Sequence, residues 1–475
     1  MNDFVINIKK VMLVFLLLFI ALISYITYIY MFNSEKAVSS TFNQRLWAER
    51  NKVLRGTIYD KDMKALTKST KISEVSQKEQ YLQGEVFAHA IGYMNPVYGL
   101  AGLEKKYDGE LMGSEDTVVS KFLDFTKKEE AKVGNGLRTT LDSKLQTVAY
   151  NDLKGKRGAV VALNPKTGEI LAMVSMPSYD PNNLEKNWKA MLANKDMPLI
   201  NRAVSGLYPP GSIFKTITAI SALENIPNVY NRSFDDNGTL VFNESSSLKN
   251  YDGEVFGKID FRTAYLHSSN VVFGTLGMDL GNNALKDTAE KFYFNKDTPA
   301  SGLTIENSQF PSYKSNEKGN IAQSAIGQAQ VLASPMEMAL VASTVANDGV
   351  MMQPMLVKEI LSSKGKSLNK IAPKALGETM SKENAKTIKD LMRDVVAEGT
   401  GKNAAVSGIT VCGKTGTADH KGDASKQVAP HSWFIGFAPY ENPQIAIAVI
   451  VEEGGVGGGV AAQITRDLIS AYLQK

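Results

Sequence analysis

The chain has 475 residues, 43% of them hydrophobic and 21% charged, which is enough apolar material for two or three domains with cores of their own. With 38 glycines and 16 prolines, the chain is neither collagen-like nor of low complexity, and a net charge of +4 is too small for this length to indicate nucleic-acid binding. One cysteine and four histidines exclude a disulfide framework and leave little material for a metal site, so we expect neither metal nor cofactor.

The first apolar segment runs from Val11 to Phe32 without a charged residue, and it is long enough to cross a bilayer as a helix. Lys9 and Lys10 precede it. By the positive-inside rule they predict a cytoplasmic tail over residues 1–10, a single transmembrane anchor over 11–32 in the plasma membrane, and an outer part beyond it. A cleaved signal peptide is the alternative, with Ala37-Val38-Ser39 as the cleavage site.

The outer part divides into two regions of different character. Residues 33–152 are polar and weakly patterned, and they predict a small irregular domain; within it, RGTIYDKDMKAL from Arg55 to Leu66 predicts a strand, a turn and a strand. Residues 153–475 predict a larger α+β domain, a five-stranded antiparallel sheet with helices on both faces. Its expected strands are Gly158–Leu163, Glu169–Ser175, Ile409–Thr417, Ser432–Ala438 and Ile445–Val451, and Val460–Leu473 is expected to be a helix.

The first candidate site is the segment YPPGSIFKTITAISALEN. Its Pro-Pro-Gly turn precedes Ser212, which we expect to open a helix, and Lys215 follows three residues later on the same side of the first turn. Serine is a weak nucleophile unless a base is adjacent, and a lysine with a pKa lowered by burial or by another cation can be that base. The same spacing recurs in polar segments that are typical of loops, for example from Ser363 to Lys366, so the spacing alone is weak evidence.

The second candidate site is LHSSNVVFGTLG, where Ser268 and Asn270 lie between two apolar helical stretches. A hydroxyl there can relay a proton and an amide can orient a peptide bond. An ordinary helix cap explains the same residues, because serine and asparagine are both favoured at that position.

The third candidate site is ITVCGKTGT, which places Lys414, Thr415, Gly416 and Thr417 on an expected strand. The glycine lets a substrate backbone approach closely. Lys414 can bind a carboxylate, and its charge can lower the pKa of a nearby lysine.

Ser-x-x-Lys, Ser-x-Asn and Lys-Thr-Gly, in this order, are the signature of active-site serine penicillin-recognising enzymes. Together with RGTIYD at 55–60, GLEKKYDGEL at 102–111 and ALNPKTGEILAMVSMPSYDPN at 162–182, they make the chain resemble a class B penicillin-binding protein, a membrane-anchored peptidoglycan D,D-transpeptidase. The resemblance implies a penicillin-binding transpeptidase domain over 153–475, a pedestal or dimerisation-like domain over 33–152, and a part in cell-wall synthesis that serves cell shape or division.

The resemblance also implies a role for each motif. Ser212 would attack the carbonyl between the two terminal D-alanines of a stem peptide, Lys215 would take its proton, and Ser268 would relay a proton to the leaving amine. An acceptor amine of a neighbouring strand would then take the acyl group, and a β-lactam would acylate the same serine. The other implied members are Asn270 lining the pocket, Lys414, Thr415 and Thr417 on the substrate carboxylate, Gly416 within that strand, and the backbone N–H groups of Ser212 and Thr417 as the oxyanion hole.

Several other activities fit parts of this pattern. A D,D-carboxypeptidase would use water in place of the acceptor amine. A β-lactamase would need a deacylating glutamate, which no segment clearly supplies. A non-catalytic β-lactam sensor or scaffold would not need the complete set of motifs. By family analogy, a membrane glycosyltransferase is the expected partner, and nucleic acid is not.

Four further features have structural explanations that we prefer. Cys412 reads as a buried strand residue rather than a reactive thiol, and His431 as a residue at a loop or strand edge. The run Gly457-Gly458-Gly459 fits a turn, because too little chain follows it for a dinucleotide fold. The methionines between Met336 and Met355 are expected to fill the core.

Overall fold

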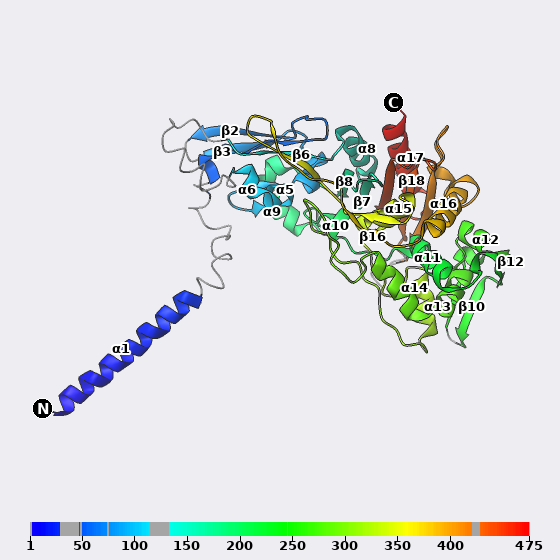
Figure 1. The fold of residues 1–475 in the computed structure, drawn as a ribbon, viewed down its shortest axis with the longest axis horizontal. Helices are drawn as coiled ribbons and strands as arrows, with labels where there is room; N and C mark the ends of the chain where they lie inside the picture. Colours follow the sequence, from blue (N-terminus) through cyan, green and yellow to red (C-terminus); the bar gives the residue numbers. More distant parts are fainter. Residues whose placement is uncertain are drawn as a thin grey trace.

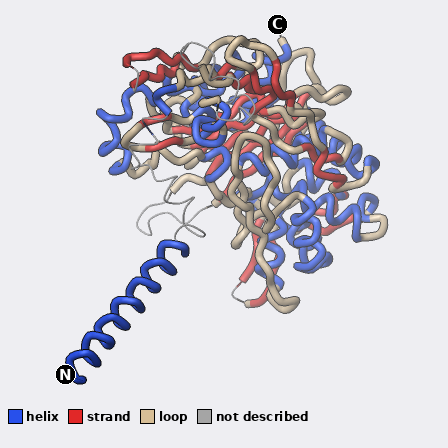
Figure 2. The backbone as a smooth tube through the Cα atoms, turned by 60° about the vertical axis from the view of Figure 1, so that its left-hand side comes forward, coloured by secondary structure: helices blue, strands red, loops and turns tan. Residues whose placement is uncertain are grey.

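The structure is a computed structural model that describes residues 2–28, 47, 50–73, 76–113, 133–244, 246–419 and 428–474. Its first element, helix α1 (Asn2–Tyr28), lies clear of the rest of the molecule (Figures 1 and 2). The segment Ile6–Tyr25 of this helix is long and apolar enough to cross a membrane, with a mean hydropathy of 2.4 and 0% of it buried.

This apolar span begins earlier in the chain than the anchor expected over 11–32. The span includes Lys9 and Lys10, and long basic side chains of this kind can reach polar surroundings from within an apolar helix. The alternative cleavage site, Ala37-Val38-Ser39, lies outside the described residues.

A buried ion pair organises the N-terminal domain. The Arg55 guanidinium donates to Glu104 over 2.5 Å and to Asp108 over 2.7 Å, and the side chains of Arg55 and Glu104 are each only 1% exposed. The contact joins the RGTIYD segment to the GLEKKYDGEL segment. Two stretches singled out in the sequence are thus two halves of one structural unit.

The strands of this domain differ from the sequence prediction. The expected strand, turn and strand are reduced to the two-residue β1 (Ile58–Tyr59) and a bridge from Tyr59 to Ala65. The longest pairing is instead the hairpin of β2 (Thr67–Ser73) and β3 (Ser76–Tyr81), whose mostly polar strands carry no apolar alternation to reveal them. The other elements are α4 (Ala88–Ile91), β4 (Met94–Asn95), β5 (Gly99–Leu100), α5 (Gly102–Lys106) and α6 (Asp108–Leu111).

The larger domain is built on a five-stranded sheet in which every neighbouring pair is antiparallel, as the sequence predicted. Strand β17 begins three residues later than expected, because Ile409 N donates to Val406 O at 3.2 Å and closes a tight turn there. In spatial order the strands are β17 (Cys412–Ala418), β18 (His431–Ala438), β19 (Ile445–Val451), β7 (Gly158–Leu163) and β8 (Ile170–Met176).

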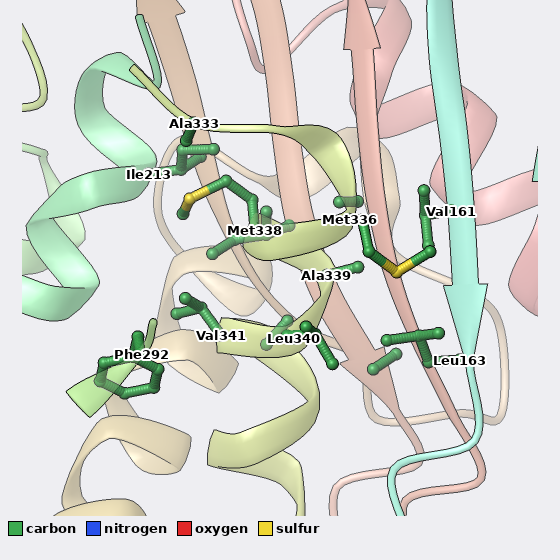
Figure 3. Packing of buried hydrophobic residues seen from close by; sticks show 14 of the residues in the cluster. Val161, Leu163, Ile213, Phe292, Ala333, Met336, Met338, Ala339, Leu340 and Val341 are labelled. Atoms are coloured by element: carbon green, nitrogen blue, oxygen red, sulfur yellow. The ribbon is translucent and has the colours of Figure 1, made fainter. Parts of the chain in front are cut away.

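Helices cover both faces of this sheet, which explains why its strands are apolar throughout. Alternate residues of β7 enter different clusters: Val161 packs with helix α15 (Pro335–Ala346), whereas Val160 packs with helices α8 (Ser143–Leu153) and α17 (Val460–Leu473). Figure 3 shows Met336 of α15 directed toward Val161 and Met338 toward Ile213. Met336, Met338, Met351 and Met355 are buried, which confirms the expectation that they fill the core, whereas Met352 is only half-buried and does not belong to it.

Most of the remaining helices lie between β8 and β17 in the chain, and those within residues 215–325 form the lower right of the body in Figure 1. They are α9 (Leu184–Ala193), α10 (Arg202–Ser205), α11 (Lys215–Asn225), α12 (Phe261–Leu266), α13 (Asn270–Lys291), α14 (Lys318–Ala325) and α16 (Lys382–Ala397). The short strands among them are β9 (Ser233–Asp236), β10 (Thr239–Asn243), β11 (Ser246–Lys249), β12 (Gly257–Asp260), β13 (Val350–Met352) and β16 (Ala375–Glu378).

A second sheet of four strands connects the two domains. Its order is β1, β6 (Gly136–Thr139), β14 (Val357–Leu361) and β15 (Ser367–Lys370). Strand β6 pairs with β1 on one side and with β14 on the other, although more than two hundred residues separate β6 from β14 in the chain. The N-terminal domain is therefore hydrogen-bonded directly to a hairpin of the larger domain.

Candidate active site

Ser212 lies in a tight 3₁₀ turn at the N-terminal end of α11. The turn covers Gly211–Phe214, and the α-helix itself begins at Lys215, three residues later than the sequence suggested. Gly211 has φ +56°, and a Cβ there would lie 2.6 Å from Thr417 O on β17. Only glycine permits this approach, and the turn that holds Ser212 is thereby pressed against the Lys-Thr-Gly strand.

Ser268 and Asn270 occupy the junction between α12 and α13. Ser268 has φ +59°, an uncommon conformation for a residue with a side chain, and such strain is often found at functional sites. Ser269 caps α13, since its Oγ accepts from Val272 N at 3.0 Å. The cap prediction thus holds for the middle residue of the motif, while its two neighbours face the lysines.

The Lys215 amine is directed at this junction. Its Nζ donates to Ser268 O at 2.6 Å, to Asn270 Oδ1 at 2.7 Å and to Ser268 Oγ at 3.2 Å. In the described part of the chain no hydrogen bond joins Nζ to the Ser212 hydroxyl. Catalytic hydrogen bonds often form or shorten only once substrate is bound, so the lack of this bond is compatible with Lys215 as the base.

Lys414 reaches the same hydroxyl from the edge strand of the sheet. Its Nζ donates to Ser268 Oγ at 2.9 Å and to Thr415 O at 3.1 Å. Ser268 Oγ therefore accepts from both amines and links the three motifs. Both lysine side chains are fully buried at 0% exposure.

This burial changes the basicity of both amines. Desolvation lowers the pKa of Lys414 to about 7. Burial, and secondly the charge of Lys414, hold the pKa of Lys215 well below its ordinary value, while Asp236 opposes the shift. The expected effect of Lys414 on a neighbouring lysine is thus the second cause of the lowered pKa of Lys215. A lowered pKa favours the neutral form of the amine, which is the form that can act as a base.

Two loops hold the remaining Lys-Thr-Gly residues from outside the strand. The hydroxyls of Thr415 and Thr400 lie 2.6 Å apart, and Thr417 Oγ1 accepts from Gly457 N at 3.2 Å. A Cβ on Gly457 would come within 2.2 Å of Gly416 O. The glycine run at 457–459 therefore forms a close backbone contact with the site, whereas the sequence indicated only a turn.

Buried polar residues behind the Ser-x-Asn motif were not found from the sequence. Asp236, at the end of β9, is 0% exposed and accepts from Ser269 Oγ at 2.5 Å. Asn250 Oδ1 accepts from Asn270 N at 2.8 Å. Asp236 stands in the run Asp-Asp-Asn-Gly, which reads as a turn, and no sequence signal connects it to a motif thirty residues away.

Cys412 and His431, for which the sequence analysis preferred a structural role, lie beside the site and not in it. Cys412 is buried at 0%, and burial raises the pKa of its thiol, as fits a structural strand residue. His431 begins β18, where its ring packs edge-on against Tyr208 and its Nδ1 accepts from Glu453 N. Among the described residues no group of His, Cys, Asp and Glu is arranged to hold a metal ion.

Comparison with known proteins agrees with the family resemblance found in the sequence motifs. Residues 158–470 match the penicillin binding protein transpeptidase domain, and residues 55–136 match the penicillin binding protein A dimerisation domain. The chain is 34% identical to the peptidoglycan D,D-transpeptidase PbpA of Mycolicibacterium smegmatis over 83% of its own length and 84% of that protein. It is 29% identical to the peptidoglycan D,D-transpeptidase MrdA of Acinetobacter baumannii over 84% of its length and 66% of that protein.

Solved structures resemble the whole body of the molecule. Penicillin-binding protein A of Mycobacterium tuberculosis, solved as its ceftriaxone acyl-enzyme, superposes with a TM-score of 0.84 at 30% identity over 90% of this chain and 100% of that one. The D,D-transpeptidase domain of a peptidoglycan glycosyltransferase from Eggerthella lenta gives 0.80 at 33% identity, over 89% and 99% of the two chains.

Proposed function

This chain belongs to the family of penicillin-binding protein transpeptidases, and we propose that it is a peptidoglycan D,D-transpeptidase whose nucleophile is Ser212. The observation that carries the proposal is the shared hydroxyl of Ser268, which accepts from two fully buried lysines beside the turn that holds Ser212. Such a site offers a nucleophile, a neutral amine as base and a second amine for an anion.

In the acylation step, Ser212 Oγ attacks the carbonyl carbon between the two terminal D-alanines, and its proton passes to Lys215 Nζ. The tetrahedral intermediate carries its negative charge on the former carbonyl oxygen, which the backbone N–H groups of Ser212 and Thr417 stabilise; one such donor is typically worth about 10²–10³ in rate. The C–N bond then breaks, the leaving amine gains a proton through Ser268, and an ester of Ser212 remains.

In the second step an acceptor amine attacks this ester, and Ser212 leaves with its proton restored. Lys414, Thr415 and Thr417 hold the terminal carboxylate of the donor in the first step, with Gly416 leaving room for its backbone. A bound carboxylate would favour the charged form of Lys414, whose pKa burial lowers to about 7. A β-lactam follows the same first step and leaves a slowly hydrolysed acyl-enzyme.

The proposal extends to the placing of the chain in the cell. The apolar segment Ile6–Tyr25 of helix α1 supports a membrane anchor, because it is 0% buried against the rest of the molecule. Lys9 and Lys10 support a cytoplasmic N-terminus with the catalytic domain on the outer side of the plasma membrane. On this side of the membrane, a glycosyltransferase that makes the glycan strands is the partner we propose.

The test is covalent labelling of the full-length protein in detergent with a fluorescent penicillin. We expect a stable label on the wild-type chain and none on Ser212→Ala. Ser363→Ala is the matched control, because Ser363 and Lys366 repeat the Ser-x-x-Lys spacing in an exposed hairpin, and it should label like wild type. A folded wild-type protein that takes no label would contradict the proposal, and rapid loss of label would favour a β-lactamase.

A donor-analogue reaction then distinguishes the two peptidase outcomes. With a D-Ala-D-Ala stem peptide and a primary amine acceptor, a transpeptidase forms the new amide together with free D-alanine. Free D-alanine without the amide, at saturating acceptor, would identify a D,D-carboxypeptidase instead.

A further inference from the structure

The only carboxylate that influences the Lys215 amine in the described part of the chain belongs to Asp236. Both oxygens of this carboxylate are occupied by donors. Oδ2 accepts from Ser269 Oγ at 2.5 Å, and Oδ1 accepts from Asn250 Nδ2 at 2.7 Å and from Gly238 N at 2.9 Å. Asp236 is 0% exposed and ends strand β9, which its pairing with β12 holds in place.

Two of these donors connect Asp236 to the first turn of helix α13. Ser269 donates to Asp236 and at the same time accepts from Val272 N, so the carboxylate fixes the rotamer of the helix cap. Asn250 accepts from Asn270 N at 2.8 Å and Val271 N at 3.1 Å through Oδ1. Its other end, Nδ2, is the group bound to Asp236. The free N–H groups of this helix end are thus satisfied by residues that Asp236 orients.

The residues fixed in this way flank the two groups that bind Lys215. Ser268 and Asn270 are the immediate neighbours of Ser269, and they supply all the oxygens that accept from Lys215 Nζ. Ser268 is also held in the left-handed region, which the surrounding structure must enforce. The buried contacts of Asp236 with Ser269 and Asn250 supply support of this kind next to Ser268.

We propose that Asp236 is a positioning residue of the active site: through Ser269 and Asn250 it holds Ser268 and Asn270 against Lys215, and its negative charge acts on the Lys215 amine. The inference rests on the proposed acylation chemistry. Asp236 does not touch the substrate in this scheme, and it acts entirely through the residues that do.

The charge has a directional consequence, because few ionisable groups surround Lys215. They are Lys414 on β17, which lowers the pKa of Lys215, and Asp236 on β9, which raises it; burial is the largest cause and lowers it. The aromatic neighbours are Phe273, whose ring lies 5.8 Å from Lys215 Nζ, and Tyr265, whose ring lies 5.7 Å from Lys414 Nζ. Removing the Asp236 charge therefore leaves Lys215 with a still lower pKa.

The experiment measures the second-order rate constant for acylation by a fluorescent penicillin as a function of pH, on full-length protein in detergent. The acidic limb of this profile reports the loss of a proton from the general base. For Asp236→Asn we expect the plateau of the rate constant to be about tenfold lower, because the groups that hold Lys215 are less well placed. We also expect the acidic limb to move to lower pH by about one unit, the smallest shift typical of losing a nearby opposite charge. Ser269→Ala keeps the charge but breaks the link, and it should lower the plateau without moving the limb.

Asp235→Asn is the matched control, because it removes the same charge from the neighbouring, exposed position of β9. It should keep the wild-type plateau and limb. Failure of the proposed function would appear as a wild-type protein without label. Failure of this inference would appear as normal labelling of the wild-type protein together with one of two results for Asp236→Asn. Either its pH profile would equal that of the wild type, or its plateau would fall while the acidic limb stayed in place. The second result would mean that Asp236 only supports the helix cap.

Should Asp236→Asn not fold, Ser269→Ala carries the test alone. A wild-type plateau in that variant would overturn the proposal, since the link between the carboxylate and the motif would then have no effect on acylation. A tenfold lower plateau with an unmoved limb would support it.

Discussion

Lys215 and Lys414 are the same type of residue, both fully buried, and their surroundings give them different chemistry. Lys215 is held by three oxygens of the Ser-x-Asn junction and lies beside a second amine, and burial with that charge depresses its pKa strongly. Burial lowers the pKa of Lys414 to about 7. Neighbouring groups whose surroundings act differently on their pKa values are a common basis for dividing acid–base roles. These differences support the proposed roles, in which Lys215 takes the proton and Lys414 binds the anion.

A third buried ionisable residue, Glu337, predicts a pH dependence of stability. It lies in the first turn of α15 at 0% exposure; one carboxyl oxygen accepts from Thr298 Oγ1 at 3.0 Å, and the other is buried without a hydrogen-bond partner. Burial raises its pKa to about 8. The folded state therefore keeps a proton that the unfolded state loses, and the stabilisation present at acidic pH is lost as pH rises toward 8.

Glu337→Gln has no proton to lose, so it should be more stable than wild type above pH 8, by about 1–3 kcal/mol. The advantage should shrink as the pH is lowered. Thermal unfolding across a series of pH values measures this. Glu383→Gln, an exposed change in the first turn of α16, is the control and should alter stability little. A Glu337→Gln curve parallel to that of the wild type would contradict the argument.

Among the elements, the sequence predicted the bounds best where the apolar pattern was unbroken from one end of a buried segment to the other. Strands β7 and β19 and helix α17 have the predicted bounds, because both faces of the sheet are covered and every strand residue is apolar. The hairpin of β2 and β3 was missed for the opposite reason, since polar residues fill it.

The site was predictable only as far as local patterns extend. Each lysine and serine motif was found from its spacing and from its place before a helix or on a strand. Asp236, Asn250, Thr400 and Gly457 were not, because their contacts with the motifs join segments distant in sequence. Such residues become visible only when the fold brings β9, the end of α16 and the last loop next to the same three motifs.

The loop before α17 leads to a prediction at this scale. A Cβ on Gly457 would lie 2.2 Å from Gly416 O and 2.6 Å from Gly416 N, which are backbone atoms that cannot turn away. Gly457→Ala should therefore displace the edge strand β17 and its Lys-Thr-Gly residues. We expect penicillin acylation to fall at least about tenfold, since small displacements of binding groups cost rate steeply, while the melting temperature changes little because the contact is at the sheet edge.

Val456→Ala provides the control for this variant, because Val456 is an exposed neighbour in the same loop, at 45% exposure. It should acylate at the wild-type rate. Gly457→Ala acylating as fast as wild type would show that the strand tolerates the displacement, and the assigned role of the loop would then be wrong.

At the scale of the whole molecule, the two domains share secondary structure across the boundary expected at residues 152 and 153. All of helix α8 except its last residue, Leu153, lies on the N-terminal side of that boundary, yet Leu145 and Ala149 pack into the cluster beneath α17 and the five-stranded sheet. Strand β6, also on that side, pairs with β14 of the larger domain. These contacts make the region between the two domains a structural connection and not a flexible linker.

This connection predicts how fragments of the chain behave. A fragment of residues 153–475 would lose α8 and β6, which would expose the apolar surface under α8 and leave β14 with an open edge; a fragment of residues 133–475 keeps both elements. Burying a leucine is worth about 1.5–3 kcal/mol, so the loss of Leu145 alone is a large share of a typical domain stability. We expect the shorter fragment to aggregate and to take little penicillin label, and the longer one to be soluble and to label at Ser212.

Size-exclusion chromatography with in-gel labelling of both fragments measures this. Equal solubility and equal labelling would mean that the larger domain is independent of residues 133–152, and that the shared sheet and helix contribute little to its stability.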